Sequence, residues 1–203
     1  IFDDLFPILR SITGPGYKKS LEILSKYIDL KYIKYKSGKK IFDWIVPYEW
    51  FFYSGYITNR KGKKIIDVKN NNLHILNYSA PVDKKVSLNE LQKHLYTIRE
   101  LPDAIPYSTS YYKKNWGFCT TYNQKKNIKD RHYHVKINSE FRKGYLINGI
   151  STIKGQSKKL NLITSYLCHP SMANNELSGP LVLLGLYNKI KKWKNHNYTY
   201  KFL

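Results

Sequence analysis

The segment at residues 160–193 constrains the fold most, because it has the pattern of a strand, a loop and a helix in succession. Residues 160–167 form a short, largely apolar run of the length expected for a buried strand. Residues 180–193 carry apolar side chains with the one-sided spacing of an amphipathic helix, at Val182, Leu186, Ile190 and Trp193. A strand that leads into a helix in this way is typical of an α/β sheet with a parallel strand. We therefore predict an α/β fold.

The loop between the two, at residues 168–179, carries the side chains best suited to chemistry. Ligands of α/β sheets bind at the carboxyl ends of the strands, which is where this loop lies. It contains His169, Asn174, Asn175 and Glu176 and no basic residue. A neutral imidazole and a carboxylate are both zinc ligands, so the sequence predicts a metal site at His169 and Glu176. Asn175 could contribute only a neutral carbonyl oxygen.

These residues also have structural interpretations. A single histidine after a strand is more often part of the packing than a ligand, and an acidic residue near the start of a helix is stabilised by the helix dipole. His132 and His134 would point the same way on a strand and form a second candidate pair, although an exposed strand face explains them equally well. The sequence contains no glycine-rich phosphate loop and no serine nucleophile elbow.

The net charge of +21 raises the question of nucleic acid binding. Lysines are spread along the whole chain, however, and arginine, the preferred residue for base and bidentate phosphate contacts, is scarce. We therefore expect no nucleic acid partner. No apolar run is long enough to span a bilayer, and the two cysteines, Cys119 and Cys168, form no paired motif. We expect a cytoplasmic protein without membrane contact, with both thiols reduced and Cys168 packed beneath the loop.

The chain is expected to contain two domains. Residues 42–110 read as a small β-rich unit, inserted into an α/β domain that is formed by residues 1–41 and 111–203. Residues 198–203 alternate like a strand and have no turn after them. We interpret the chain as a fragment whose α/β domain is incomplete at its C-terminus.

Local signals within the β-rich unit are a hairpin signature at residues 59–62 and a capping box at residues 87–90. The unit also opens on an aromatic cluster, consisting of Trp44, Trp50, Phe51, Phe52 and Tyr53. Such side chains could stack on sugars or on a partner protein, but packing in a core or interface is the interpretation that we favour.

At the loop itself the sequence resembles a known family. The run CHPSMANNELSG at residues 168–179 resembles the metal loop of bacterial aminopeptidase-like proteins that carry an inserted domain of unknown function. These proteins are relatives of the co-catalytic zinc aminopeptidases. The resemblance covers almost the whole chain, through the runs LFPILRSITG at 5–14, FDWIVP at 42–47 with Glu49 and Trp50, Leu73–His74, Tyr78–Ser79, IPYSTSYY at 105–112 and WGFC at 116–119.

The resemblance implies an aminopeptidase-like, phosphorylase/hydrolase-like three-layer fold that binds two zinc ions. His169 matches the first zinc ligand of the family pattern. Many relatives place an aspartate that bridges the two metals where this chain has Asn175, and the neighbouring residue here is Glu176. Either Glu176 has taken over the bridge, or one metal site is weak or lost. The general base and the remaining ligands of the family lie past Leu203, so no catalytic residue of this chain is matched.

The implied function is that of a zinc-dependent aminopeptidase-like hydrolase of amide or peptide bonds, with an association with surface polysaccharide biosynthesis. Its substrate would be a small peptide or amide, and a homo-oligomer is compatible with the sequence. Two ligands alone cannot assemble a two-metal site, so we expect the fragment by itself to be inactive. The alternative is a catalytically inactive binding module of the same fold that recognises a saccharide or a protein partner.

Overall fold

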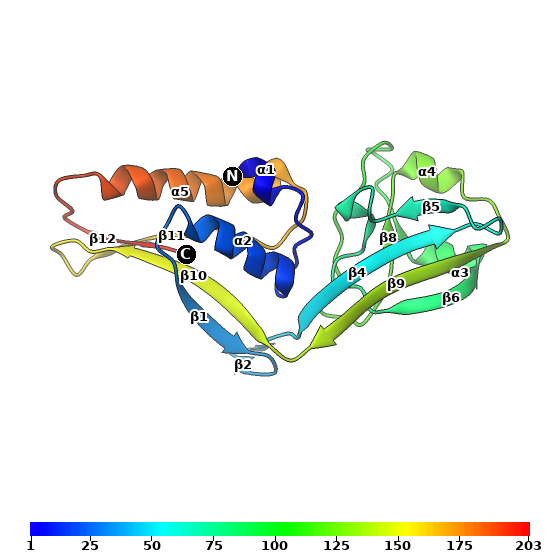
Figure 1. Ribbon diagram of the computed structural model, residues 1–203, viewed down its shortest axis with the longest axis horizontal. Helices are drawn as coiled ribbons and strands as arrows, with labels where there is room; N and C mark the ends of the chain where they lie inside the picture. The colour runs from blue at the N-terminus through cyan, green and yellow to red at the C-terminus, as the bar shows by residue number, and fades with distance from the viewer. The chain divides into compact units, whose positions relative to one another are not determined.

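The computed structural model describes residues 1–203 as two compact units. The first consists of Ile1–Glu49 and Lys143–Leu203, and the second of Trp50–Arg142. In Figure 1 the first unit is coloured blue at its first segment and yellow to red at its second, and the second unit runs from cyan to green. The chain therefore leaves the first unit once, builds the second, and returns.

The first unit is built on a mixed four-stranded sheet. Its strands are β1 (Lys31–Lys36), β10 (Tyr145–Ile153), β12 (Thr199–Phe202) and β11 (Leu160–Ile163), in the spatial order β1-β10-β12-β11. β10 is antiparallel to both of its neighbours, whereas β11 and β12 are parallel. The parallel pair is joined by α5 (Ser178–Lys191), so the predicted strand, loop and helix form a β-α-β crossover. The α/β fold class is confirmed.

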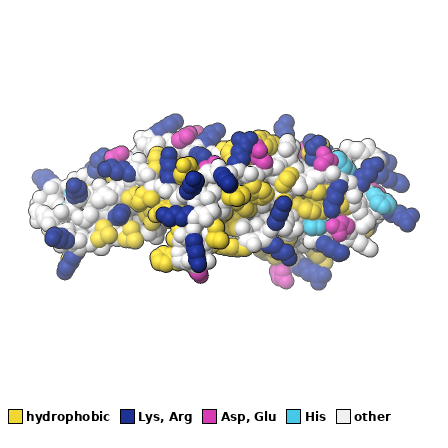
Figure 2. Space-filling view, turned by 90° about the horizontal axis from the view of Figure 1, so that it is seen from below, with side chains coloured by type: hydrophobic (Ala, Val, Ile, Leu, Met, Phe, Trp, Pro, Cys, Tyr) yellow, Lys and Arg dark blue, Asp and Glu magenta, His cyan; other side chains and the backbone are white.

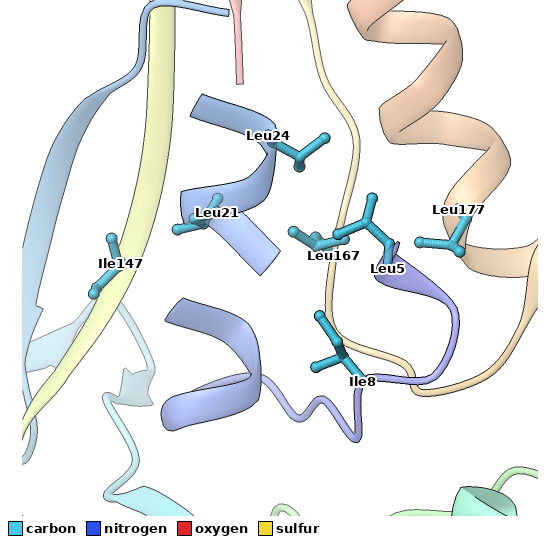
Figure 3. Packing of buried hydrophobic residues seen from close by; sticks show 7 residues of the cluster. All are labelled: Leu5, Ile8, Leu21, Leu24, Ile147, Leu167 and Leu177. Carbon is cyan, nitrogen blue, oxygen red and sulfur yellow. The ribbon is translucent and has the colours of Figure 1, made fainter. Parts of the chain in front are cut away.

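Two helices pack on the same face of this sheet. α2 (Pro15–Ser25) buries Leu21 and Leu24 against Ile147 of β10, and α5 packs against Phe202 of β12. Ile147 and Phe202 point to one face, because Phe202 is paired with Ser151, which lies four residues after Ile147 on the same strand. Figure 3 shows the resulting core around the short helix α1 (Phe2–Leu5), with the side chains of Leu5, Ile8, Leu21, Leu24, Ile147, Leu167 and Leu177.

The second unit is a β-rich domain around another four-stranded sheet. Its strands are β5 (Lys64–Asp67), β4 (Glu49–Thr58), β9 (His132–Arg142) and β6 (Val82–Ser87), in that order. The remaining elements are short: β7 (Leu95–Tyr96), β8 (Phe118–Cys119), η1 (Asn72–His74), α3 (Leu88–Lys93) and α4 (Tyr122–Lys126). Its fully buried side chains include Ile57, Leu91, Phe118 and Val135.

Both local signals predicted in this unit are present. β4 and β5 pair as an antiparallel hairpin, and the Asn59 side chain accepts hydrogen bonds from the amides of Lys61 and Lys63 in its turn. Gly62 has φ +76°, a conformation that glycine adopts without steric cost. At the second signal, the Ser87 hydroxyl accepts a hydrogen bond from the Glu90 amide and caps α3.

The boundaries between the units differ from the expected range of 42–110. β9 was expected in the α/β domain, but it lies between β4 and β6 and therefore belongs to the second unit. At the other boundary, β2 (Lys40–Ile41) and β3 (Trp44–Ile45) form a small hairpin that belongs to the first unit. An alternating pattern identifies a strand but does not specify its partner, because the pairing is made with residues distant in sequence.

The aromatic cluster at the start of β4 is largely packed. Trp50 is buried, and its indole nitrogen donates a hydrogen bond to the Ser79 carbonyl. Phe51 and Phe52 are half-buried, whereas Tyr53 is exposed and its hydroxyl is bonded to Glu140. Trp50 is therefore a core residue and is not available to stack on a sugar.

The surface is rich in lysine and arginine, and Figure 2 shows these side chains scattered over the visible face without gathering in one patch. No helix combines the length and the apolar character that crossing a bilayer requires.

Candidate metal centre

The predicted loop is held at both ends by the core of the first unit. Pairing beyond β11 continues through hydrogen bonds between Ser165 and Leu203 and between Leu203 and Ile163. Leu167 then enters the apolar cluster, and Leu177, at the far end of the loop, enters the same cluster (Figure 3). Because both leucines pack in the same cluster, the polar residues between them in the sequence lie close together.

The loop is more regular than expected. Ala173–Leu177 forms a π-helical turn, η2, which runs directly into α5. Such turns are frequent at functional sites, because they displace side chains from the positions that an α-helix would give them. The hydroxyl of Ser178, the first residue of α5, donates a hydrogen bond to the Asn174 carbonyl.

The three predicted ligands lie together. The Nδ1 atom of His169 is 3.1 Å from Oε2 of Glu176 and 3.1 Å from Oδ1 of Asn175. The Cys168 sulfur joins them: one donor atom from each of Cys168, His169 and Glu176 lies within 4.8 Å of the other two. Sequence reasoning treated Cys168 as packing, although its place next to His169 in the same loop was a signal for a ligand.

His132 and His134 are not part of any comparable cluster of His, Cys, Asp and Glu side chains in residues 1–203. His134 bonds Asp83 through Nε2 at 2.6 Å, and His132 is exposed at the start of β9. The pair has the polar strand face that the sequence predicted for it.

Glu176 is an unusual carboxylate, because its side chain is fully buried. Apart from the contact of Oε2 with Nδ1 of His169, its oxygens have no hydrogen-bond partner in the protein. The Nε atom of Arg10 lies 4.0 Å from Oε1, at the outer limit of an ion pair. A buried carboxylate with so few partners is costly, and a bound cation is one of the ways in which proteins satisfy such a group.

Arg10 connects the loop to the N-terminal segment, and sequence reasoning did not identify it. Its side chain is fully buried. It donates from Nε to the His169 carbonyl at 3.1 Å, and from Nη1 to the Leu5 carbonyl at 2.6 Å and the Ser20 hydroxyl at 3.2 Å. Burial lowers the pKa of Arg10, and the neighbouring Glu176 and Cys168 act in the opposite direction. Arg10 thereby fixes the backbone at His169 and places a positive charge beside Glu176.

The charges of the cluster act most strongly on His169. Burial disfavours its protonated form, but the side chains of Cys168 and Glu176 outweigh this effect and raise the pKa of the imidazole to about 10. Burial, with smaller contributions from the same two residues, raises the pKa of the Tyr17 hydroxyl to about 12. The local field therefore favours a positive charge at the imidazole, as expected beside an anionic donor set.

Tyr166 holds the exposed side of the loop. Its ring packs edge to face against His169, with centroids 5.4 Å apart. Its hydroxyl donates to the backbone carbonyl of Asn175. The imidazole is thus held between an aromatic ring and a buried carboxylate.

A cavity of about 320 Å³ opens beside the cluster within the first unit. Its lining is mostly apolar and comes from α2, β10 and α5, with Tyr166 and Cys168 at the side of the loop. Cys168 therefore belongs both to the donor cluster and to the lining of the cavity.

These donors fit a zinc ion. Imidazole nitrogen, carboxylate oxygen and thiolate sulfur are the three protein ligand types of zinc, and the only close partner of the Glu176 oxygens is the imidazole of His169. Asn175 provides a neutral amide where a bridge between two cations would need an anionic group. The residues present therefore fit one zinc ion better than a pair.

Comparisons with known proteins agree with this fold. Residues 49–140, which fall almost entirely in the second unit, match the domain of unknown function DUF2172. A Clostridium acetobutylicum protein, named for polysaccharide biosynthesis and an aminopeptidase-like domain, is 45% identical over 203 residues, which is 100% of this chain and 46% of that protein. The chain therefore spans about half the length of this curated relative.

Solved structures give the same result. A crystal structure from Clostridium acetobutylicum, of a protein assigned as a peptidase, superposes with a TM-score of 0.93 at 45% identity, over 99% of this chain and 47% of that one. BSAP, a zinc aminopeptidase from Bacillus subtilis, superposes with a TM-score of 0.61 at 10% identity, over 99% and 59%, which is a likeness of fold alone. The chain is thus similar along its whole length to an aminopeptidase-like protein of about twice its length, and it contains a segment that matches the DUF2172 domain.

Proposed function

We propose that this chain forms part of a zinc-dependent, aminopeptidase-like hydrolase that cleaves an amide or peptide bond. The observation that carries the proposal is the contact of 3.1 Å between His169 and the buried Glu176, at the exit of a parallel strand in an aminopeptidase-like fold. The carboxyl ends of such strands are where α/β enzymes place their ligands.

The roles of the residues follow from their contacts. His169 and Glu176 would hold the metal, with the Asn175 amide oxygen beside them. A bound zinc ion would supply Lewis acidity toward a carbonyl oxygen and lower the pKa of a bound water. Arg10 holds the His169 backbone and Tyr166 the Asn175 backbone, so the donors are positioned before any ligand binds.

The proposed substrate is a small peptide or amide, drawn from surface polysaccharide biosynthesis. The link to polysaccharide biosynthesis rests on the name of the Clostridium acetobutylicum relative. The peptide or amide substrate rests on the peptidase assignment of the similar crystal structure. We place this activity in the cytoplasm. Both cysteines are free thiols, as is usual in a reducing compartment.

The test is the zinc content of the purified full-length protein of which this chain forms part, measured by mass spectrometry together with hydrolysis of an aminoacyl anilide. We expect stoichiometric zinc in the wild type, and its loss in the double variant His169→Ala with Glu176→Ala. His132→Ala, which changes an exposed histidine outside the cluster, is the matched control and should retain the metal. A metal-free wild type without hydrolytic activity would overturn the proposal.

A second candidate function is the inactive binding module, and one residue favours it. Asn175 is neutral where the family pattern places a bridging aspartate, and loss of that charge weakens a site for two cations. In that case the protein would purify without metal while retaining its fold.

A further inference from the structure

We propose that Cys168 is a metal ligand, so that the loop binds one cation through sulfur, nitrogen and oxygen. The inference rests on the proposed function, because it concerns the same metal. It departs from a site built from His169, Asn175 and Glu176, since it adds a thiolate and leaves the amide outside the set.

The spacing of the donor atoms supports this assignment. Zinc bonds to sulfur, nitrogen and oxygen are about 2.0–2.3 Å long, so two ligands of one ion lie at most about 4.6 Å apart. The donors of Cys168, His169 and Glu176 all lie within 4.8 Å of one another. The donor separation is only slightly larger than the greatest separation that one zinc ion allows. A small rotation of the Cys168 side chain would therefore bring all three donors within bonding distance of one ion.

The charges of the cluster also support a thiolate ligand. His169 and Glu176 together offer a single negative charge when the imidazole is neutral, and the fully buried Arg10 is 4.0 Å from the same carboxylate. A thiolate adds a second negative charge, which balances a divalent cation beside that guanidinium. Asn175 cannot supply this charge, because its amide oxygen is neutral.

The buried carboxylate gives independent evidence for a ligand. The side chain of Glu176 is fully buried, yet Oε1 has only the distant Nε atom of Arg10, at 4.0 Å, and Oε2 has only the imidazole of His169, itself a proposed ligand, at 3.1 Å. A cation between this carboxylate and the thiol would give both oxygens a close partner.

The mixed donor set also selects the metal. A soft thiolate together with an imidazole suits zinc or cobalt(II), whereas magnesium and calcium require oxygen ligands throughout. Cys168 is among the residues that line the apolar cavity of about 320 Å³, so a molecule bound in this cavity would lie next to the proposed ligand.

Cobalt(II) substitution tests the proposal directly, because sulfur ligation produces a charge-transfer absorption band in the near ultraviolet that nitrogen and oxygen ligands do not. We expect the metal-free wild type to bind one equivalent of cobalt(II) with this band. Cys168→Ser should lose the band completely and bind cobalt at least about 10-fold more weakly. Cys119→Ser is the matched control: Cys119 is fully buried in the second unit, where burial raises the pKa of its thiol to about 12, and its replacement should leave the band unchanged.

Two results separate the failure of this inference from failure of the proposed function. Cobalt bound by the wild type without the band means that the thiol is not a ligand, and it overturns the inference while the metal site stands. No cobalt bound by a folded wild type, as judged by circular dichroism, overturns both. The wild-type spectrum alone shows whether a thiol binds the metal, so the proposal is testable even where Cys168→Ser does not fold.

Discussion

At the scale of single residues, the candidate centre depends on charges that are buried next to one another. Arg10 and Glu176 both have fully buried side chains, and burying charges of opposite sign near one another reduces the cost of removing each from water. Sequence reasoning identified Glu176 and His169 from their place after a strand. It missed Arg10, because nothing in the sequence distinguishes a buried arginine from one on the surface.

Replacing Arg10 with methionine should destabilise the protein by about 3–5 kcal/mol, because it removes a buried charge beside Glu176 and leaves the carbonyls of Leu5 and His169 without their hydrogen-bond donor. The free energy of unfolding in urea measures the effect. The control is Arg60→Met in the exposed turn of the β4–β5 hairpin, where a change within about 0.5 kcal/mol is expected. A change of that small size at Arg10 would mean that the buried pair does not stabilise the fold.

The stability of the metal-free protein should also depend on the protonation of His169. Its pKa is raised from 6.5 to about 10 in the folded state, so the protonated imidazole stabilises the fold fully below about pH 6.5. This contribution is lost as the pH rises through about 10. Urea unfolding at a series of pH values between these limits should show the decline.

In the variant His169→Ala the same decline should be absent, whereas His132→Ala, with its exposed imidazole, should retain it. Equal slopes in the wild type and in His169→Ala would show that another group is responsible.

At the scale of elements, the strand and the helix that flank the loop could be predicted because their patterns are local. The π-helical turn η2 could not, since its residues are polar and its shape depends on Leu167 and Leu177 entering one core. The contact of His169 with Glu176 was expected from a short loop. The closeness of the Cys168 thiol follows from the exact path of the backbone, which a sequence pattern does not encode.

The start of α2 has a sharper steric requirement. A Cβ atom on Gly16 would lie 2.0 Å from the Leu9 carbonyl oxygen, which is backbone and cannot rotate away. Gly16→Ala should therefore destabilise the protein by about 1–3 kcal/mol, although alanine normally stabilises a helix.

Gly185→Ala in α5 is the matched control, because nothing lies within 4 Å of the added Cβ. It should stabilise the protein by about 0.5–1 kcal/mol in the same urea measurement. A stabilisation at both positions would show that the chain before α2 moves aside easily.

At the scale of the whole molecule, the two units were foreseeable and their boundary was not. Aromatic density and turn signals identified a β-rich insert, and β9 was recognised as a strand. Its sheet partners β4 and β6 are formed by residues far away in the sequence, so local patterns could not assign it to the second unit. The fold class depended on one crossover, and that crossover is present.

The order of strands in the first sheet has a consequence for biosynthesis. β12 lies between β10 and β11, although it is made after both. Until residues 199–202 have left the ribosome, β10 and β11 have no strand to join them, and each exposes an unpaired edge. The loop at residues 168–179, whose preceding segment is bonded to Leu203, therefore cannot take its final place in the sheet until β12 has been made.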